Sequence, residues 1–156
     1  MSVLADQVTA LLATAPERAP ALRESLRLMM ERFRSETGTI HRLDHDGQTL
    51  HLVAEIGLPP ALLEVVKHIP VGKGIAGQTV ARGEPVSICN LQTDPSGTAR
   101  PAARQTGVGG ALCVPLRAGD EIVGTLGIGT VRPYEYPAEE ARELEELGRL
   151  IAPYLN

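Results

Sequence analysis

The sequence predicts a single α+β domain built around an antiparallel sheet. Two pairs of strand-like segments are each joined by a short turn, and helix-like segments precede, separate and follow them. The chain has 156 residues, 43% hydrophobic and 22% charged, which is the size and composition of one globular domain. A chain of this length buries enough surface to fold without a structural metal or a disulfide framework.

The N-terminal region predicts two helices with a bend between them. Apolar residues recur at helical spacing over Val3–Leu12 and again over Ala21–Arg34. Pro16 and Pro20 lie between these segments, and proline interrupts a helix interior. We therefore expect residues 1–19 to form a helical extension and residues 20–156 to form the main domain.

A first hairpin is predicted from strands over Thr39–Leu43 and Thr49–Ile56. The Asp-Gly pair at positions 46–47 is a strong signal for a two-residue turn. The register that follows from this turn pairs Leu43 with Leu50, His41 with Leu52, and Arg42 with His51. His41 and His51 therefore point to opposite faces of the sheet, which makes them poor ligands for one metal ion.

A glycine-rich segment follows a short helix predicted from the Pro59-Pro60 pair to His68. Gly72, Gly74 and Gly77 have the G-x-G-x-x-G spacing of a phosphate-binding loop. A dinucleotide fold, however, places a strand directly before these glycines and parallel βαβ units after them. Here a helix precedes the glycines and antiparallel strands follow, so we interpret them as shaping a turn and a tightly packed helix start.

The next elements are a helix over Ile75–Arg82, ended by Gly83, and a strand over Pro85–Cys89. A polar connection of 21 residues, 90–110, then follows. A connection of this length is unusual in a compact domain unless it is functional or partly helical, and Ala99–Gln105 has the composition for one or two helical turns.

Arg100 and Arg104 lie four residues apart in this connection, so on a helix they share one face. Two such guanidinium groups are suited to binding a carboxylate or a phosphate, and we predict that at least one of them contacts a ligand. The alternative is a solvated loop with Ser-Gly and Asp-Pro turns.

A second hairpin is predicted over Ala111–Leu116 and Glu121–Gly129. One set of alternating positions is bulky: Leu112, Val114, Leu116, Ile122, Leu126 and Ile128. The other set is smaller: Ala111, Cys113, Pro115, Val123, Thr125, Gly127 and Gly129. We expect the bulky side chains to pack on helices, whereas the small ones leave room for a ligand or for a closely packed helix.

The loop and this hollow face together give the predicted ligand-binding residues. They are Ile88, Asn90, Asp94, Thr98, Arg100, Arg104, Ala111, Cys113 and Thr125. No catalytic residue, metal ligand or cofactor is identified.

Pro137 opens a terminal helix with acidic residues in its first turns. Its apolar residues Leu144, Leu147, Ile151 and Leu155 follow a 3-4-4 spacing, which is a seam for helix packing. Pro153 should kink or fray the last turn.

The ordered set of these segments resembles a GAF domain, the PAS-like sensor fold. The segments that carry the resemblance are Ile69–Gly77 (IPVGKGIAG), Pro85–Cys89 (PVSIC), Leu112–Leu116 (LCVPL), Ile122–Leu126 (IVGTL) and the Tyr136–Leu144 start of the last helix. The resemblance covers residues 20–155 and implies an antiparallel sheet of five or six strands. It also implies terminal helices on one face and a ligand pocket under the 90–110 loop on the other, but a fold does not fix a ligand.

Some single-domain members of this family are free methionine-R-sulfoxide reductases. The resemblance places their cysteines at Ala76 and near Arg104, and neither position carries sulfur here. Without a thiolate at those positions the sulfoxide has no nucleophile. The Asn-Lys signature of cyclic-nucleotide-binding members and the Cys-His pair that attaches bilins are also absent from the matching stretches.

Cys89 and Cys113 lie on strands that the resemblance makes neighbours, so a redox pair is an alternative to two small buried apolar residues. The four histidines form no pair at i, i+4 on one helix, and no Cys-x-x-Cys is present, so we expect no metal site. Binding of haem through a single histidine is an alternative that the sequence does not exclude.

Composition also indicates which other partners the protein has and in which cell compartment it lies. The net charge of −4 and the scarcity of aromatic residues argue against nucleic acid. No apolar run is long enough for a membrane span, no basic leader is present, and two cysteines are too few for a disulfide scaffold. We expect a cytoplasmic protein.

The sequence thus favours a sensor or regulatory module that binds an unidentified small molecule and forms a homodimer through its terminal helices, with a separate effector protein as a further partner. A thiol-dependent redox enzyme and a ligand-free dimerisation scaffold are the competing hypotheses.

Overall fold

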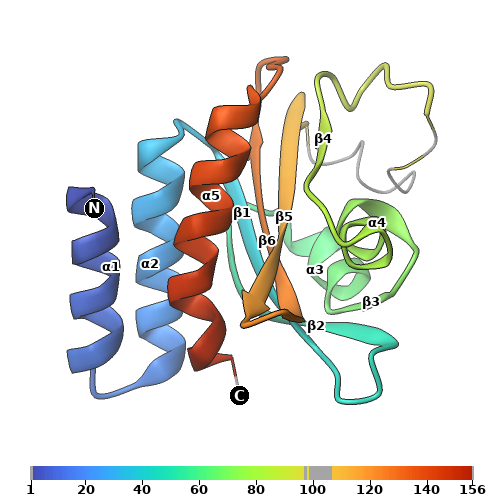
Figure 1. The fold of residues 1–156 in the computed structure, drawn as a ribbon. Coiled ribbons are helices and arrows are strands. Elements are labelled where there is room, and N and C mark those ends of the chain that lie inside the picture. The colour runs from blue at the N-terminus through green and yellow to red at the C-terminus, as the bar shows by residue number, and fades with distance from the viewer. Residues whose placement is uncertain (1, 97, 99–106, 156) are drawn as a thin grey trace.

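The structure is a computed structural model that describes residues 2–96, 98 and 107–155 (Figure 1). The helical turns expected over Ala99–Gln105 lie outside the described residues, and so do Arg100 and Arg104. The helices are α1 (Val3–Thr14), α2 (Arg18–Arg32), α3 (Pro60–Val66), α4 (Gly74–Arg82), α5 (Ala138–Ile151) and a short 3-10 helix, η2 (Ala152–Tyr154). The strands are β1 (Thr37–Leu43), β2 (Thr49–Ile56), β3 (His68–Pro70), β4 (Val86–Ile88), β5 (Gly110–Ala118) and β6 (Glu121–Thr130).

The strands form one antiparallel sheet of six strands in the order β3-β2-β1-β6-β5-β4. Helices α2 and α5 cover one face of the sheet, and α1 packs on these two helices farther from it (Figure 1). Helices α3 and α4 lie on the opposite face. The α+β class predicted from the sequence is confirmed.

The first hairpin has the predicted register, but its turn is longer than predicted. Leu43 pairs with Leu50, His41 with Leu52, and Arg42 with His51. The Asp44 N–H donates to the Thr49 carbonyl at 2.8 Å and the Gly47 N–H to the Asp44 carbonyl at 2.9 Å. The loop therefore runs over residues 45–48 rather than being a two-residue Asp46-Gly47 turn, and it closes on the same pair of strands.

Two helix boundaries differ from the prediction. Helix α2 begins at Arg18 and includes Pro20 in its first turn. The N–H groups of a first turn have no intrahelical acceptor, so the N–H that proline lacks costs no hydrogen bond there. Helix α3 ends at Val66, and His68 belongs to β3, which pairs with β2. A three-residue strand is too short to show alternation in a sequence, so this strand was not predicted.

Ile122 was predicted on the bulky face of the second hairpin, and this is wrong. A bulge shifts the pairing so that Leu116 lies opposite Gly124 and Arg117 opposite Ile122, leaving Val123 as the extra residue. Val123 packs against the main core, while the Ile122 side chain lies on the α4 side, near Gly83.

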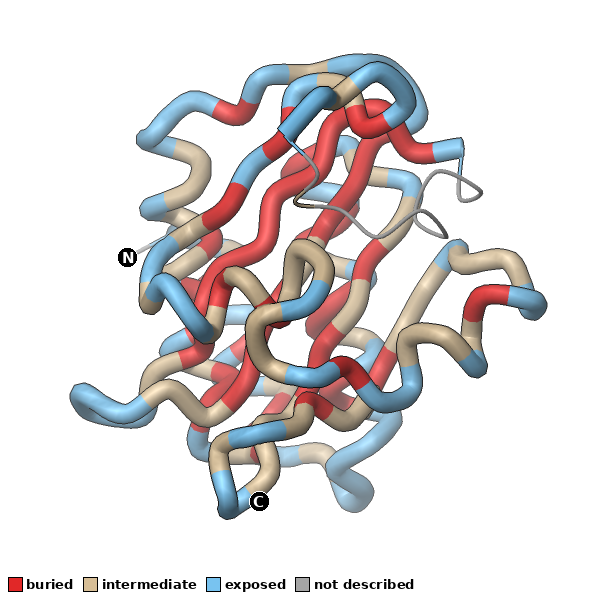
Figure 2. Tube along the Cα trace, turned by 90° about the vertical axis from the view of Figure 1, so that its right-hand side faces the viewer, coloured by how far each residue is buried: buried red, intermediate tan, exposed pale blue. Residues whose placement is uncertain are grey.

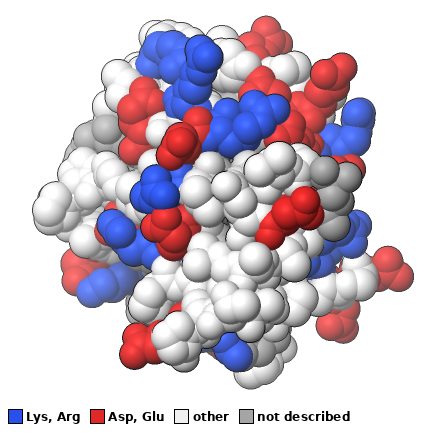
Figure 3. Space-filling view, turned by 90° about the vertical axis from the view of Figure 1, so that its left-hand side faces the viewer, with Lys and Arg blue, Asp and Glu red and all other residues white. Residues whose placement is uncertain are grey.

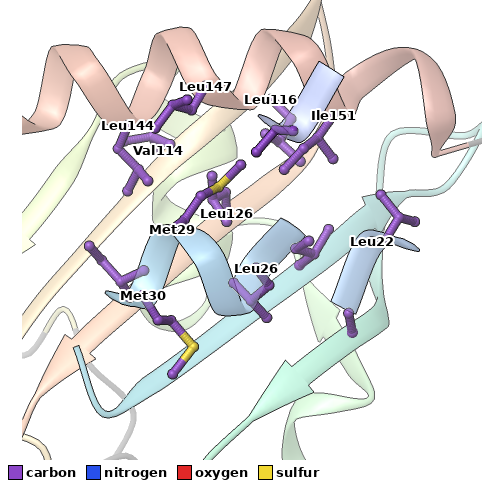
Figure 4. Packing of buried hydrophobic residues seen from close by; sticks show 14 of the residues in the cluster. Leu22, Leu26, Met29, Met30, Val114, Leu116, Leu126, Leu144, Leu147 and Ile151 are labelled. Atoms are coloured by element: carbon purple, nitrogen blue, oxygen red, sulfur yellow. The ribbon is translucent and has the colours of Figure 1, made fainter. Parts of the chain in front are cut away.

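The main core lies between the sheet and the terminal helices (Figure 4). The residues labelled there come from α2 (Leu22, Leu26, Met29, Met30), β5 (Val114, Leu116), β6 (Leu126) and α5 (Leu144, Leu147, Ile151). The predicted 3-4-4 seam of α5 is thus buried on the protein's own sheet, and so is Leu155 beyond it. Pro153 lies in η2, where the α-helix has already ended.

Within the described residues, no helix is both long enough and apolar enough to cross a membrane. Seen from the α3–α4 side, the central strands are buried along most of their length, whereas α3 and α4 stay largely in partial contact with solvent (Figure 2). The space between these two layers holds the candidate site.

Candidate ligand pocket

A cavity of about 170 Å³ lies between the sheet and helices α3 and α4. Its walls are almost entirely apolar. The sheet contributes Thr37, Gly38, Thr39, His41, Ile69, Ala111, Leu112, Cys113, Gly127, Ile128 and Gly129. The other walls are Leu58, Leu62, Val65, Val66, Gly74, Ile75, Ala76, Leu91 and Val108.

The cavity exists because β6 carries glycines where the other strands carry side chains. A Cβ on Gly129 would lie 2.6 Å from the Thr37 hydroxyl oxygen, and one on Gly127 would lie 3.1 Å from that of Thr39. Both threonines line the cavity, and neither hydroxyl has a hydrogen-bond partner among the described residues. The glycines therefore leave two hydroxyl groups available on the cavity floor.

The glycine turn before α4 is held by its own backbone. The Gly72 N–H donates to the Gly77 carbonyl at 2.9 Å, and the Gly77 N–H donates to the Lys73 carbonyl at 3.1 Å. A Cβ on Gly77 would lie 2.5 Å from the Pro70 carbonyl oxygen. These contacts agree with a turn and a tightly packed helix start, because the amides of Gly72 and Gly77 bond within the turn itself.

His41 is the buried polar residue of the cavity wall. Its side chain is 1% exposed, and Nε2 lies 2.8 Å from the Val66 carbonyl oxygen, so Nε2 carries the proton and donates it. Nδ1 is then an acceptor, and it has no partner in the described structure. Burial lowers the pKa of His41 from 6.5 to about 4, against the effect of the Val66 hydrogen bond, so the ring is neutral near pH 7.

Cys113 lies beside two threonine hydroxyls, those of Thr79 on α4 and Thr125 on β6. Burial raises the pKa of this thiol to about 11, and the two hydroxyls only partly offset the effect. The thiol therefore stays protonated and is not a nucleophile at neutral pH.

The cysteines are not close enough to form a disulfide. Val86 pairs with Cys113, and Cys89, the residue after β4, lies three residues farther along the chain, which is roughly 10 Å at the usual strand rise. A disulfide needs Cα atoms within about 7 Å of each other. Cys89 is exposed and Cys113 is buried, and both are free thiols.

Four of the predicted ligand-binding residues lie in the cavity wall or close to it. Ala111 and Cys113 line the cavity. Ile88 does not line the cavity but packs with the lining residues Leu91 and Val108. Thr125 is buried on β6 opposite His41 and does not line the cavity either.

The predicted residues of the 90–110 connection lie elsewhere. The Asn90 side chain accepts the Gln92 N–H at 3.1 Å, and Asp94 and Thr98 bond to the Ser96 hydroxyl. The Leu91 N–H donates to the Gly109 carbonyl at 2.6 Å, which joins the two described ends of the connection. Binding by Arg100 and Arg104 stays a prediction, because both lie outside the described residues.

Sequence reasoning missed the cavity residues of β1 and of α3. Thr37 and Thr39 alternate with Gly38 on β1 and lie opposite Gly129 and Gly127 of β6. This pairing of threonines with glycines was the signal that could have placed the two threonines in the cavity wall. No comparable signal marks Leu58, Leu62 or Val66, because their position depends on how α3 packs on the sheet.

The described residues contain no group of three or more histidine, cysteine, aspartate or glutamate side chains that could hold a metal ion. His41 and His51 face opposite sides of the sheet, as the register predicted. His51 instead lies against His68, a contact that depends on β3 and was not predicted.

Comparison with known proteins shows which solved structures share this fold. Solved structures that resemble the chain at high TM-score and low sequence identity include the following three. The GAF domain of a phosphoenolpyruvate-protein phosphotransferase from Coxiella burnetii matches with a TM-score of 0.82 and 21% identity, over 97% of this chain and 90% of that chain. The corresponding GAF domain from Acinetobacter gives 0.79 and 18%, over 99% and 94%. A free methionine-R-sulfoxide reductase from Neisseria meningitidis, solved with its substrate, gives 0.79 and 19%, over 97% and 86%.

Identities this low show a shared fold and no more. No curated protein sequence matches the chain significantly. The family model of the GAF domain matches residues 19–156, which is nearly the whole chain. The chain belongs to the GAF domain family.

Proposed function

We propose that this GAF domain is a regulatory module that binds a small, largely apolar molecule in the cavity between the sheet and helices α3 and α4. The observation that carries the proposal is the cavity itself: about 170 Å³ of apolar space with the Thr37 and Thr39 hydroxyls facing it. A dry apolar cavity of roughly 150 Å³ is enough to bind benzene in another protein. The size therefore suits a compound built on one ring or a small fused ring pair.

The polar groups of the wall indicate what else the ligand carries. Thr37 and Thr39 each offer a donor and two acceptor lone pairs, two residues apart along β1. None of the described lining residues is charged at neutral pH, so this part of the site suits a neutral ring with one or two hydrogen-bonding groups. A carboxylate on the ligand would need Arg100 or Arg104, which we propose as its partners.

The thiol-enzyme alternative finds little support in these residues. Ala76, the position at which the resemblance places a cysteine of the sulfoxide reductases, lines the cavity. Cys113 is held as a thiol by burial, and Cys89 is exposed and does not line the cavity. We therefore propose a non-catalytic role.

The sheet offers a direct route from the cavity to the terminal helices. Gly38 lines the cavity, and a Cβ added to it would lie 2.7 Å from Met30 Sδ and 2.9 Å from Leu26 Cδ1 on α2. One backbone position thus separates the ligand space from the helical layer. A ligand that moves β1 would move α2, provided that it binds the two arrangements with different affinity.

We further propose that two copies associate through the outer face of α1. This helix has a single charged residue, Asp6, and its Val3 side chain is 74% exposed. The face of the molecule on which α1 lies carries uncharged areas bordered by charged side chains (Figure 3). The seam of α5 is already buried within the protomer, so α1 is the terminal helix that remains for a partner.

The pocket is tested with indole and benzyl alcohol as probes, followed by two-dimensional amide NMR. Saturable shifts are expected at Thr39, Gly127 and Gly129. Ala111→Leu fills the cavity and should abolish them, whereas the matched variant Ala118→Leu, exposed on the same strand, should not. Equal shifts in both variants, or shifts that do not saturate in the wild type, would refute the pocket.

Two further experiments distinguish the binding module from a thiol enzyme and from a ligand-free scaffold. Replacing both cysteines with serine removes all turnover from a thiol enzyme but leaves a binding module able to take up its probes. For the scaffold hypothesis, the protein would stay dimeric while no probe raises its melting temperature.

The dimer is tested by light scattering on Ala10→Glu, an exposed position of α1. The variant should be monomeric, and Ala81→Glu, exposed on α4 across the sheet, should stay dimeric. A wild-type monomer would rule out the α1 interface.

A further inference from the structure

Two histidines face each other at the edge of the sheet, away from the pocket. His51 of β2 and His68 of β3 are directly opposed in the antiparallel register. Their Nδ1 atoms lie 3.0 Å apart, and the rings are nearly perpendicular, at 83° with centroids 5.0 Å apart. One Nδ1 carries a proton and donates it to the other, so at least one lone pair points into the space between the rings.

A carboxylate lies behind one of the rings. Asp44 Oδ2 is 3.4 Å from His51 Nε2, and this buried nitrogen has no hydrogen-bond partner among the described residues. At this distance the carboxylate electrostatically favours a proton on Nε2, which favours Nδ1 of His51 as the unprotonated nitrogen. Metal-binding histidines are commonly oriented by a carboxylate in this way.

We propose that His51 and His68 bind a divalent transition-metal ion through their Nδ1 atoms, with Asp44 as a positioning residue. Nitrogen ligands lie about 2.0–2.1 Å from such a metal, so two of them at a right angle are about 2.9 Å apart, and at a tetrahedral angle about 3.4 Å. The observed 3.0 Å fits the right angle. Tetragonal coordination with imidazole ligands is typical of Cu²⁺ and Ni²⁺.

The surroundings leave room for the ion and do not repel it. His68 is exposed on an edge strand, so its ring is accessible and can turn toward a metal. Each nearby cation is paired with a carboxylate: Arg42 with Asp44 at 3.9 Å, and Lys67 with Glu64 at 2.7 Å. The protein supplies two ligands and water supplies the others, so the site is a partial one with its remaining positions open.

The site touches the pocket through β3. Ile69, the residue after His68, lines the cavity, and the Val71 N–H that follows donates to the Gln48 carbonyl at 2.9 Å. A metal that joins β2 to β3 would fix this edge of the cavity wall. The metal site does not depend on the proposed ligand-binding function, and its test uses the metal alone.

The test is calorimetric titration with Ni²⁺ at pH 7.5. The wild type should bind one ion per chain. His68→Gln should bind it at least about tenfold more weakly, and Asp44→Asn should reduce the affinity by about tenfold at unchanged stoichiometry. His45→Gln removes an exposed histidine from the same hairpin and should change nothing. Circular dichroism checks that every variant is folded.

A second measurement tests the metal site independently of any difference in stability between the variants. The electron paramagnetic resonance spectrum of the Cu²⁺-loaded wild type should show coupling to two imidazole nitrogens, and that of His68→Gln to one. Identical spectra would overturn the site, as would a wild-type Ni²⁺ titration that does not saturate, or a loss of affinity in His45→Gln equal to that in His68→Gln.

Discussion

His41 should make the protein less stable as the solution is acidified, because the folded state holds this ring neutral. The ring is 1% exposed, and its Nε2–H bonds to the Val66 carbonyl at 2.8 Å. Burial lowers the pKa from 6.5 to about 4. The unfolded chain therefore binds a proton at a higher pH than the folded chain does, and stability rises with pH across this interval.

The size of the effect follows from the two pKa values. Above pH 6.5 the full stability is present, and it declines between pH 6.5 and pH 4. The total loss below pH 4 is about 3 kcal/mol, and the loss between pH 7.5 and pH 5 is about 2 kcal/mol. In a domain whose stability is of the order of 5–15 kcal/mol, this change is readily measured.

Urea unfolding at pH 7.5 and pH 5 measures the change. Carboxylates also begin to titrate at pH 5, so the wild type is compared with His41→Gln, whose amide can still donate to Val66 but does not ionise. The variant should lose about 2 kcal/mol less than the wild type between the two pH values. If both lose the same amount, His41 is not held neutral by burial.

Further predictions concern the glycine turn, the thiols and the arginines. Gly77→Ala should lower the free energy of unfolding by about 1–3 kcal/mol in urea, since its Cβ would lie 2.5 Å from a backbone oxygen; an unchanged midpoint would contradict the close packing. A thiol reagent should modify Cys89 quickly and Cys113 only after unfolding, and equal rates would show that Cys113 is not buried. Replacing Arg100 and Arg104 with alanine should weaken binding of benzoate but not of benzyl alcohol; equal benzoate affinity would remove both arginines from the site.

Much of the fold could be predicted because its signals are local. The first hairpin's register follows from strand positions close in sequence, and the alternation of large and small residues along β5 predicted which face packs on helices. The end of α4 at Gly83 followed from the αL conformation that glycine adopts readily.

The parts that were missed depend on contacts between distant segments. The bulge that turns Ile122 toward α4 is set by pairing across the hairpin, and β3 forms only because β2 is there to pair with it. The His51–His68 contact depends on that strand. The cavity was expected from its small residues, but its outline depends on how α3 and α4 pack on the sheet.

Native mass spectrometry of freshly purified wild type and Ala111→Leu is the direct test of whether the cavity holds a ligand. We expect a defined small adduct, released on denaturation, on the wild type and not on the variant. A wild type that carries no adduct and takes up no indole would contradict it, and so would the same adduct on both proteins.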